Sequence, residues 1–465
     1  MAQQRIKEKG KVFRDPVHRL IRIEPEDQFV LDLINSQPFQ RLRRIRQLGV
    51  SSLTYHGAEH SRFVHSMGVF NFAQRIAATL IRRYGTDSDV ARVLIQYRKP
   101  LLAAALLHDI GHGPFSHMIE RAHNSSFDHE KMTSKLIREE KGEIHSVLTS
   151  HSIDPDIVAS IIEKTGPHRL VIDIVSSQLD ADRMDYLLRD SHMTGVEYGI
   201  YDAEWLLNAM CVGIDPSDEP GNESPQWRLC LDINRGLFAA EQLILARHHM
   251  MLQVYMHRVT RGYEVMLLNL FKHAASLLAK ADKLPEGTHR SVLSYFKTGI
   301  DMPFADWLNF DETSMVATLQ NWGFDSPDPI LKRFSTAFLE RDRLYIPIDL
   351  MKVPPQALME LNDKLNQAGL AKGVDWGTDD GVHLPYKGLF HKASKGDTEE
   401  QSALSILLSD GSITSRGSAI ENHSKVLKGL DNEGQSVTRL YISRDKFDKA
   451  IPVLDSLRIA HGGAA

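Results

Sequence analysis

Apolar residues recur every three to four positions along most of the chain, which is typical of amphipathic helices. One helix is predicted to begin near Pro100, because proline is favoured in the first turn of a helix. It is predicted to run through a wholly apolar stretch into His108. The same period predicts helices over 28–47, 63–84, 157–164, 170–190 and 234–280. The sequence therefore predicts a mainly α fold.

Some segments depart from helical spacing. Residues 209–213 and 227–232 alternate apolar and polar positions, and the turn-rich stretch 215–225 lies between them, so we predict a hairpin with a long loop. Residues 11–23 also look extended, with the turn Asp15-Pro16 inside them.

The composition and the hydrophobic pattern of the chain change after about residue 340. Residues 344–348 and 440–442 resemble strands, and the stretches between them are rich in Gly, Asp, Ser and Lys. We therefore predict a helical domain over 1–340, with the hairpin as a small insertion, and a smaller C-terminal α/β lobe over 341–465.

Composition narrows the functional classes. The chain has 465 residues, 42% of them hydrophobic and 25% charged, with a formal net charge of −5, so it lacks the global basic field of sequence-independent nucleic-acid binders. Its two cysteines cannot form a disulfide framework. The N-terminus has no apolar signal core, and the apolar run 101–107 is too short to cross a bilayer. We expect a cytoplasmic protein that does not enter a membrane.

Candidate chemistry gathers around one string, His-Asp-Ile-Gly-His-Gly-Pro-Phe-Ser-His over 108–117. Burying the adjacent pair His108 and Asp109 at the end of an apolar helix is costly unless the side chains are paired or bind a metal. Imidazole nitrogen and carboxylate oxygen suit Mn, Fe, Zn or Ni. Gly111, Gly113 and Pro114 then end the helix and let the backbone approach a ligand. The string predicts a metal site.

Two more ligands come from other helices. His65 lies near the start of the helix at 63–84, on the side of its apolar residues, and is predicted to point inward. Asp182, Tyr186 and Asp190 are spaced by four residues and share one face of a helix. We predict that His65, His108, Asp109 and Asp182 bind one divalent ion.

The ordered motifs resemble those of the HD-domain phosphohydrolases, and most closely the deoxynucleoside triphosphate (dNTP) triphosphohydrolases. His65, His108-Asp109 and Asp182 are similar to the H…HD…D signature of that family. Residues 11–18, 39–49, 60–66, 108–117, 182–190 and 247–258 resemble its successive motifs, over roughly 10–340. The resemblance implies an HD-domain helical core that hydrolyses a dNTP to a deoxynucleoside and inorganic triphosphate, with a metal-activated water attacking the α-phosphate.

The resemblance also implies roles for individual residues. His112 and His117 would face the α-phosphate, while Glu120 and His129 would form the proton-transfer pair with Glu130 alongside. The remaining substrate contacts would be Arg62, Arg183, Arg247 and Arg258 on the triphosphate, Tyr186 against the sugar, Gln47 and Asp190 on the 3′-hydroxyl, and Tyr255 elsewhere on the substrate.

Cofactor and partners follow from the same resemblance. It implies one divalent metal ion (Mn, Fe, Co, Zn, Ni or Mg), with further Mg carried by the triphosphate, and a homo-oligomer of two, four or more chains. Activation by an allosteric nucleotide stays open, because Asn35 and Arg14 depart from the pattern of guanine-activated relatives; nucleic-acid binding stays open as well. Two alternatives remain: another HD nucleotide phosphohydrolase, such as a 5′-nucleotidase or cyclic-nucleotide phosphodiesterase, or a regulator that binds nucleotide or nucleic acid without turnover.

Overall fold

The computed structural model describes residues 10–122, 128–214, 226–350, 353–379, 405–414, 424, 426 and 438–461. Helices dominate these residues and the sheets are small, which confirms the mainly α prediction. None of the helices in these ranges is both long and apolar enough to span a membrane.

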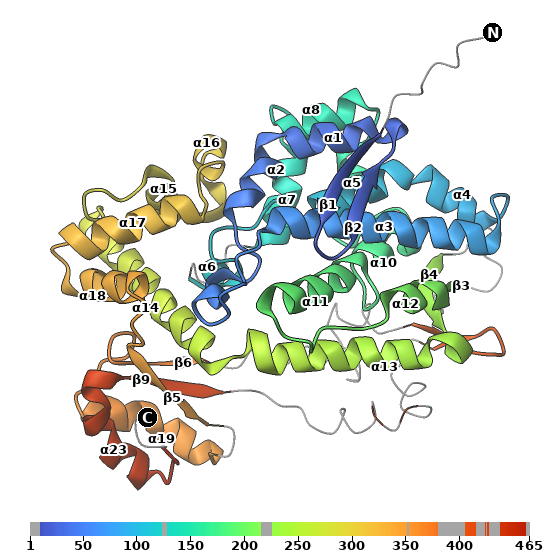
Figure 1. Ribbon diagram of the computed structural model, residues 1–465. Coiled ribbons are helices and arrows are strands. Elements are labelled where there is room, and N and C mark those ends of the chain that lie inside the picture. The colour runs from blue at the N-terminus through green and yellow to red at the C-terminus, as the bar shows by residue number, and fades with distance from the viewer. Residues whose placement is uncertain are drawn as a thin grey trace.

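The core is built around α3 (Arg62–Tyr84), which packs against α5 (Arg98–Leu107) and α11 (Ala181–Thr194) (Figure 1). Every residue of α5 from Leu101 to Leu107 is buried, as expected for a helix that is apolar all round. The three helices therefore form a frame in which α3 and α11 carry predicted metal ligands and the chain directly after α5 carries the other two.

An N-terminal hairpin covers α3. The strands β1 (Lys11–Asp15) and β2 (Arg19–Ile23) pair antiparallel, which confirms the extended prediction for 11–23. The hairpin lies across α3 (Figure 1), and β2 packs on that helix. Its turn faces the frame that holds the site.

The other helices surround this frame. They are α1 (Gln28–Asn35), α2 (Gln37–Arg41), α4 (Asp89–Gln96), α6 (His117–Ala122), α7 (His129–Arg138), α8 (Glu143–Ser150), α9 (Pro155–Ile162), α10 (Arg169–Val175), α12 (Ala203–Ala209), α13 (Ile233–Met250), α14 (Arg258–Ala281), α15 (Arg290–Thr298), α16 (Phe304–Trp307), α17 (Glu312–Asp325) and α18 (Pro329–Leu339).

Two helices predicted as continuous over 28–47 and 170–190 are broken, so those predictions were wrong. The first ends at Ser36, whose backbone is extended, because Pro38 in the first turn of α2 cannot continue a preceding helix. The second is interrupted before α11. There the Asp180 carboxylate accepts hydrogen bonds from the backbone N–H groups of Ser177 (2.8 Å) and Arg183 (2.7 Å). Such a cap competes with helix continuation.

The helix predicted over 234–280 is also two helices. Between α13 and α14 the chain makes a wide π-helical turn, in which the Met256 N–H donates to the Met251 carbonyl at 2.8 Å. Turns of this kind recur at functional sites. Here the turn brings Tyr255 back against α11.

The hairpin predicted between residues 209 and 232 is confirmed by β3 (Met210–Ile214) and β4 (Trp227–Asp232), in which Cys211 lies opposite Cys230. Its predicted loop, 215–225, lies outside the described residues. A later segment extends this sheet: β7 (Ile406–Leu407) pairs parallel to β4, and β8 (Ile413–Thr414) pairs with β7. The alternation pattern did not predict this addition, because such short strands carry little periodicity.

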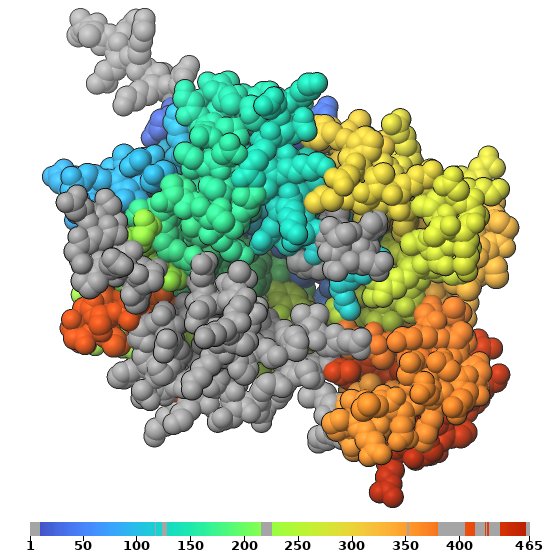
Figure 2. All heavy atoms as spheres, turned by 180° about the vertical axis from the view of Figure 1, so that it is seen from behind, coloured from blue at the N-terminus to red at the C-terminus, as the bar shows by residue number. Residues whose placement is uncertain are grey.

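The C-terminal lobe has a three-stranded antiparallel sheet in the order β5-β9-β6. Its elements are β5 (Tyr345–Asp349), α19 (Pro355–Gln367), β6 (Trp376–Asp379), β9 (Arg439–Ser443) and α23 (Phe447–Ser456). The strands expected at 344–348 and 440–442 are thus present. The lobe has its own apolar cluster and projects at one corner of the molecule (Figure 2). It docks on α14, where the Tyr441 hydroxyl donates to the Arg258 carbonyl at 3.0 Å.

Candidate metal and phosphate site

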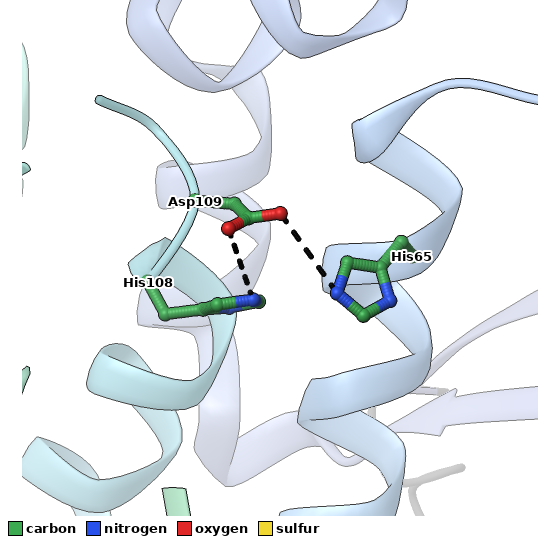
Figure 3. A group of neighbouring side chains, drawn as sticks. All are labelled: His65, His108 and Asp109. Carbon is green, nitrogen blue, oxygen red and sulfur yellow. Dashed lines mark ion pairs between the residues drawn. The ribbon is translucent and has the colours of Figure 1, made fainter. Parts of the chain in front are cut away.

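The four predicted metal ligands converge. His65 lies in the first turn of α3, while His108 and Asp109 directly follow α5 (Figure 3). His65 Nε2 lies 3.8 Å from Asp109 Oδ2, and His108 Nε2 lies 3.3 Å from Asp109 Oδ1. Asp182, in the first turn of α11, places Oδ1 3.0 Å from His65 Nε2 and 3.8 Å from His108 Nε2. Donor atoms from α3, from α11 and from the chain directly after α5 therefore lie close together.

Hydrogen bonds orient both imidazoles for metal binding. The Nδ1 atom of His65 bonds to Asp185 Oδ2 at 2.9 Å, and that of His108 bonds to the Ala105 carbonyl at 3.0 Å. A proton on Nδ1 leaves the Nε2 lone pair toward the shared point, as in histidines that bind metals. His108 Nε2 is buried and has no hydrogen-bond partner among the described residues. The donor set and this buried nitrogen fit a divalent ion.

The electrostatics of the cluster also call for a cation. Burial lowers the pKa of His65, but its hydrogen bonds to Asp182 and Asp185 outweigh that effect and raise it to about 10. Burial opposes ionisation of Asp109, yet the charge of Arg62 holds its pKa well below the usual range. The cluster thus favours positive charge at its centre, which a proton or a metal ion supplies.

Two arginines fix the segment that begins with His108 and Asp109. Arg62, predicted to bind substrate, lies 2.5 Å from Asp109 Oδ2 and donates to Ser116 Oγ at 3.2 Å. Arg41 is buried beneath the loop and donates to the carbonyl of His112 at 2.9 Å. Buried guanidinium groups with several donors are well suited to hold backbone carbonyls in place.

A pair of stacked histidines lies beside the cluster. The rings of His112 and His129 are 3.9 Å apart and nearly parallel, and His112 Nε2 is 3.3 Å from Asp109 Oδ1. His129 Nδ1 bonds to Glu120 Oε1 at 2.7 Å. Burial lowers the pKa of both histidines, but Glu120 reverses the effect at His129 and raises its pKa. One histidine is therefore biased toward the neutral form and its neighbour toward the protonated form.

Two more residues were assigned near this pair, and the structure describes the side chain of one of them. The Glu130 carboxylate points to Lys164, 3.3 Å away, and is 44% exposed, so the structure does not bring it to the Glu120–His129 pair. His117 belongs to α6, but its side chain lies outside the described part of the chain.

Two arginines lie among the mainly apolar residues that line a small pocket between α11 and α13. Arg183 and Arg247 both face it, together with Gln178, which accepts a hydrogen bond from Arg247 at 2.8 Å. Arg183 also forms an ion pair with Asp180, while its Nε atom is buried without a hydrogen-bond partner in the described structure. Arg258, predicted to join this set, is exposed at the start of α14 and does not line the pocket.

The residues predicted to contact the sugar and its 3′-hydroxyl lie near Tyr255, another predicted substrate contact. Asp190 is buried and accepts from the Tyr255 hydroxyl at 2.7 Å, and the rings of Tyr255 and Tyr186 meet edge to face at 6.3 Å. Gln47 has its side-chain oxygen buried without a hydrogen-bond partner in the described residues. His60 completes the group, since its Nε2 lies 2.8 Å from Asp190 Oδ1.

Two residues of the site were missed by the sequence reasoning: His60 and Asp185. His60 stands five positions before His65, and Asp185 three positions after Asp182. A helical position three residues from a ligand shares its side of the helix, so this spacing could have drawn attention to Asp185. No local pattern links His60 to Asp190, because 130 residues separate them.

Comparison with known proteins places this geometry in context. Residues 62–190 match the model of the HD domain family. The chain is 34% identical to the uncharacterized protein YwfO of Bacillus subtilis over 436 residues, which cover 94% of this chain and 92% of that protein.

More distant relatives carry functional names. The chain is 28% identical to the deoxynucleoside triphosphate triphosphohydrolase SAMHD1 homolog of Dictyostelium discoideum over 60% of its own length, which spans about half (52%) of that protein. A crystal structure of a phosphohydrolase from Bacteroides thetaiotaomicron has the same fold, with a TM-score of 0.69 at 24% identity over 93% of this chain and 99% of that one.

Proposed function

The chain belongs to the HD-domain family, and on that premise we propose that it hydrolyses deoxynucleoside triphosphates to a deoxynucleoside and inorganic triphosphate. One observation carries the proposal: the His65, His108, Asp109 and Asp182 donors converge beside the Glu120–His129 pair. A set of metal ligands next to a histidine whose pKa is raised suits the cleavage of a phosphate ester, because a metal ion activates water and the histidine can protonate the leaving oxygen.

The arginine pocket supports a triphosphate substrate. Arg183 and Arg247 line one pocket, and Arg183 belongs to the same helix as Asp182. Guanidinium groups neutralise phosphate oxygens through bidentate contacts, which a nucleoside monophosphate would use less fully. We therefore assign these two arginines to the β- and γ-phosphates, with the α-phosphate toward the metal ligands.

The residues assigned to the sugar support a deoxynucleoside substrate. Asp190 is held by His60 and Tyr255, so its carboxylate is fixed as an acceptor for the 3′-hydroxyl. The backbone N–H of Gln47 donates to the His60 carbonyl at 2.9 Å, and we assign Gln47 to the same hydroxyl. The ring of Tyr186 meets that of Tyr255 and belongs to the helix of Asp182. We assign Tyr186 to the sugar face, where a 2′-hydroxyl would crowd its ring.

The chemistry follows from these assignments. A bound metal ion would lower the pKa of water and polarise a phosphoryl oxygen. Water adds to the α-phosphorus and releases a proton to solvent, the bond from that phosphorus to the 5′-oxygen breaks, and His129 is reprotonated from solvent after each turnover. His129, whose charge Glu120 stabilises, gives its proton to the departing 5′-oxygen. His112, stacked on His129, stays neutral and donates its N–H to an α-phosphate oxygen.

The direct test is a product analysis. The purified protein is incubated with each dNTP, each NTP, a nucleoside 5′-monophosphate and a cyclic nucleotide in Mn²⁺, Mg²⁺, Co²⁺ or Fe²⁺, and the products are separated by ion-exchange chromatography. Release of triphosphate and deoxynucleoside supports the proposal. Release of monophosphate from a nucleotide, or opening of a cyclic nucleotide, would assign another phosphohydrolase activity. Tight dNTP binding without product in any metal would assign a regulator.

Two further questions concern the assembly of the chain and its activation by a nucleotide. We propose that the chain forms a homo-oligomer, as the family resemblance implies, and light scattering of the purified protein measures its mass. Repeating the activity assay with each dNTP and GTP as an added effector tests for an activating nucleotide.

A further inference from the structure

Asp185 is a fully buried carboxylate with three different partners. It belongs to α11 but does not face the metal position; instead it bonds to His65 Nδ1 at 2.9 Å. Its second partner is His18 Nε2, at 2.6 Å, and its third is Arg189, which donates from two nitrogens at 2.7 and 2.9 Å. A carboxylate with so many partners has one fixed orientation, because turning it would break several charge-assisted bonds.

Two of those partners lead to the turn of the N-terminal hairpin. Arg189 also donates to Asp15 Oδ2 at 2.9 Å, and both arginine and aspartate are buried. Asp15 in turn accepts from the backbone N–H groups of Val17 and His18 at 2.9 Å each, which sets the turn between β1 and β2. The His18 ring packs edge to face on Phe72 of α3, and its side chain is only 3% exposed. The hairpin turn is therefore linked to Asp185 in two ways: directly through His18, and through Arg189, which bonds to both Asp15 and Asp185.

The backbone of α3 leaves room for this arrangement at Gly68. A Cβ atom at that position would lie 1.8 Å from Asp185 Oδ1 and 2.6 Å from an Arg189 nitrogen. Glycine weakens a helix interior, so its presence in the middle of α3 calls for a packing reason. The close approach of Asp185 supplies that reason.

We propose that Asp185 is a positioning residue for metal binding and that the N-terminal hairpin holds it in place, so that order in the turn 15–18 and metal affinity are thermodynamically coupled. Asp185 fixes the ring plane of His65 and the proton on its Nδ1, which leaves Nε2 as the ligand atom. His18 and the Asp15–Arg189 pair fix Asp185. By reciprocity, the metal must stabilise the turn as much as the turn stabilises metal binding.

The first experiment measures metal affinity directly. Metal-free wild type and variants are titrated with Mn²⁺ in a calorimeter, at a temperature where circular dichroism shows each to be folded. His18→Ala removes one bond to Asp185, and Gly68→Ala pushes on its carboxylate while favouring the helix. Each should weaken Mn²⁺ binding by about 10- to 100-fold, the usual effect of losing such an outer partner. Arg22→Ala, an exposed change on the same hairpin, is the matched control and should bind as wild type does.

The second experiment tests reciprocity without any assay of activity. Amide hydrogen exchange of the hairpin, residues 11–23, should slow when Mn²⁺ is added to wild type, while β5 in the C-terminal lobe should not change. In His18→Ala this slowing should shrink. A merely structural role for the network would lower the melting temperature of the variants and leave both the affinity and the metal-dependent slowing as in wild type. That result would overturn the inference.

The inference rests on the proposed function only through the metal site, and the outcomes separate the two. If wild type binds Mn²⁺ and the variants bind it weakly, the coupling stands even when no dNTP is hydrolysed. If wild type releases triphosphate and the variants bind Mn²⁺ as tightly as wild type, the coupling fails and the function stands. A wild type that binds no divalent metal overturns both.

Discussion

Replacing His129 by alanine separates proton transfer from binding. His129 is not one of the four proposed metal ligands. Its Nδ1 bonds to Glu120 Oε1 at 2.7 Å, and its ring stacks on that of His112 with centroids 3.9 Å apart. Alanine removes the proposed proton donor but leaves the metal ligands and the arginine pocket intact. The variant should therefore keep its metal and bind dNTP almost normally.

The expected loss of turnover is large compared with any loss of stability. A positioned general acid contributes about 10²- to 10⁴-fold, or roughly 3 to 5 kcal/mol at the transition state. The hydrogen bond to Glu120 is partly exposed, and losing it should cost about 1 kcal/mol of folding free energy. That cost is too small to unfold a typical domain. A fall in kcat with little change in KM would thus report the transition state alone.

The assay measures kcat and KM for dNTP hydrolysis, metal content and melting temperature for each variant. His151→Ala is a matched control, because His151 also bonds a carboxylate, Asp32, at 2.7 Å and is similarly exposed (27% against 23% for His129). Glu120→Gln should lower kcat by about tenfold, and the double variant should be no worse than His129→Ala if the pair acts as a unit. A folded, metal-loaded His129→Ala enzyme with near wild-type turnover would refute the general-acid assignment.

Three further predictions address the ligands, the sugar and the pH dependence of stability. His65→Ala and Asp109→Ala should each lose bound metal by elemental analysis, and a variant that retains full occupancy would remove that residue from the ligand set. Tyr186→Ala should narrow the ratio of kcat/KM for dATP over ATP by about tenfold, about 1.4 kcal/mol of discrimination; equal rates on dATP and ATP in wild type would contradict the assignment. Burial raises the pKa of Glu312 from 4.5 to about 7, so the folded chain holds a proton there that the unfolded chain has lost, and stability falls as pH rises between these values. The free energy of unfolding of Glu312→Gln should therefore exceed that of wild type by up to about 3 kcal/mol above pH 7. Denaturant titrations at pH 5.5 and 8 should show that it changes less with pH than in wild type. The same pH dependence in both proteins would show that Glu312 ionises normally.

Several elements follow from the sequence because their causes are local. The apolar period of α3 and the continuous apolar run of α5 predicted both helices, and the alternation around Cys211 and Cys230 predicted the β3–β4 hairpin. Helical period and strand alternation depend on neighbouring residues only. The string that begins with His108-Asp109 predicted metal chemistry for the same reason, since it concentrates polar donors at the end of a buried helix.

The three helix breaks show where periodicity is insufficient. Apolar spacing continues across Ser36, across 176–180 and across the turn at Met251–Tyr255, so each pair of helices resembles one. A proline in a first turn, a capping aspartate and a wide turn end the helices by satisfying or removing single hydrogen bonds. Those individual bonds contribute little to an average over a window of apolar residues.

What the sequence determined by itself was the mainly helical class and the residue types of the site, since both are written in short-range patterns. Only the tertiary structure decided which polar groups meet across long separations. Asp185 joins His65 from 120 residues away and His18 from 167, and His60 reaches Asp190 from 130. It also turned Glu130 toward Lys164 and away from the proton-transfer pair. Such contacts depend on how α3, α11 and the hairpin pack, and packing is set by the sum of many buried contacts that no local pattern encodes.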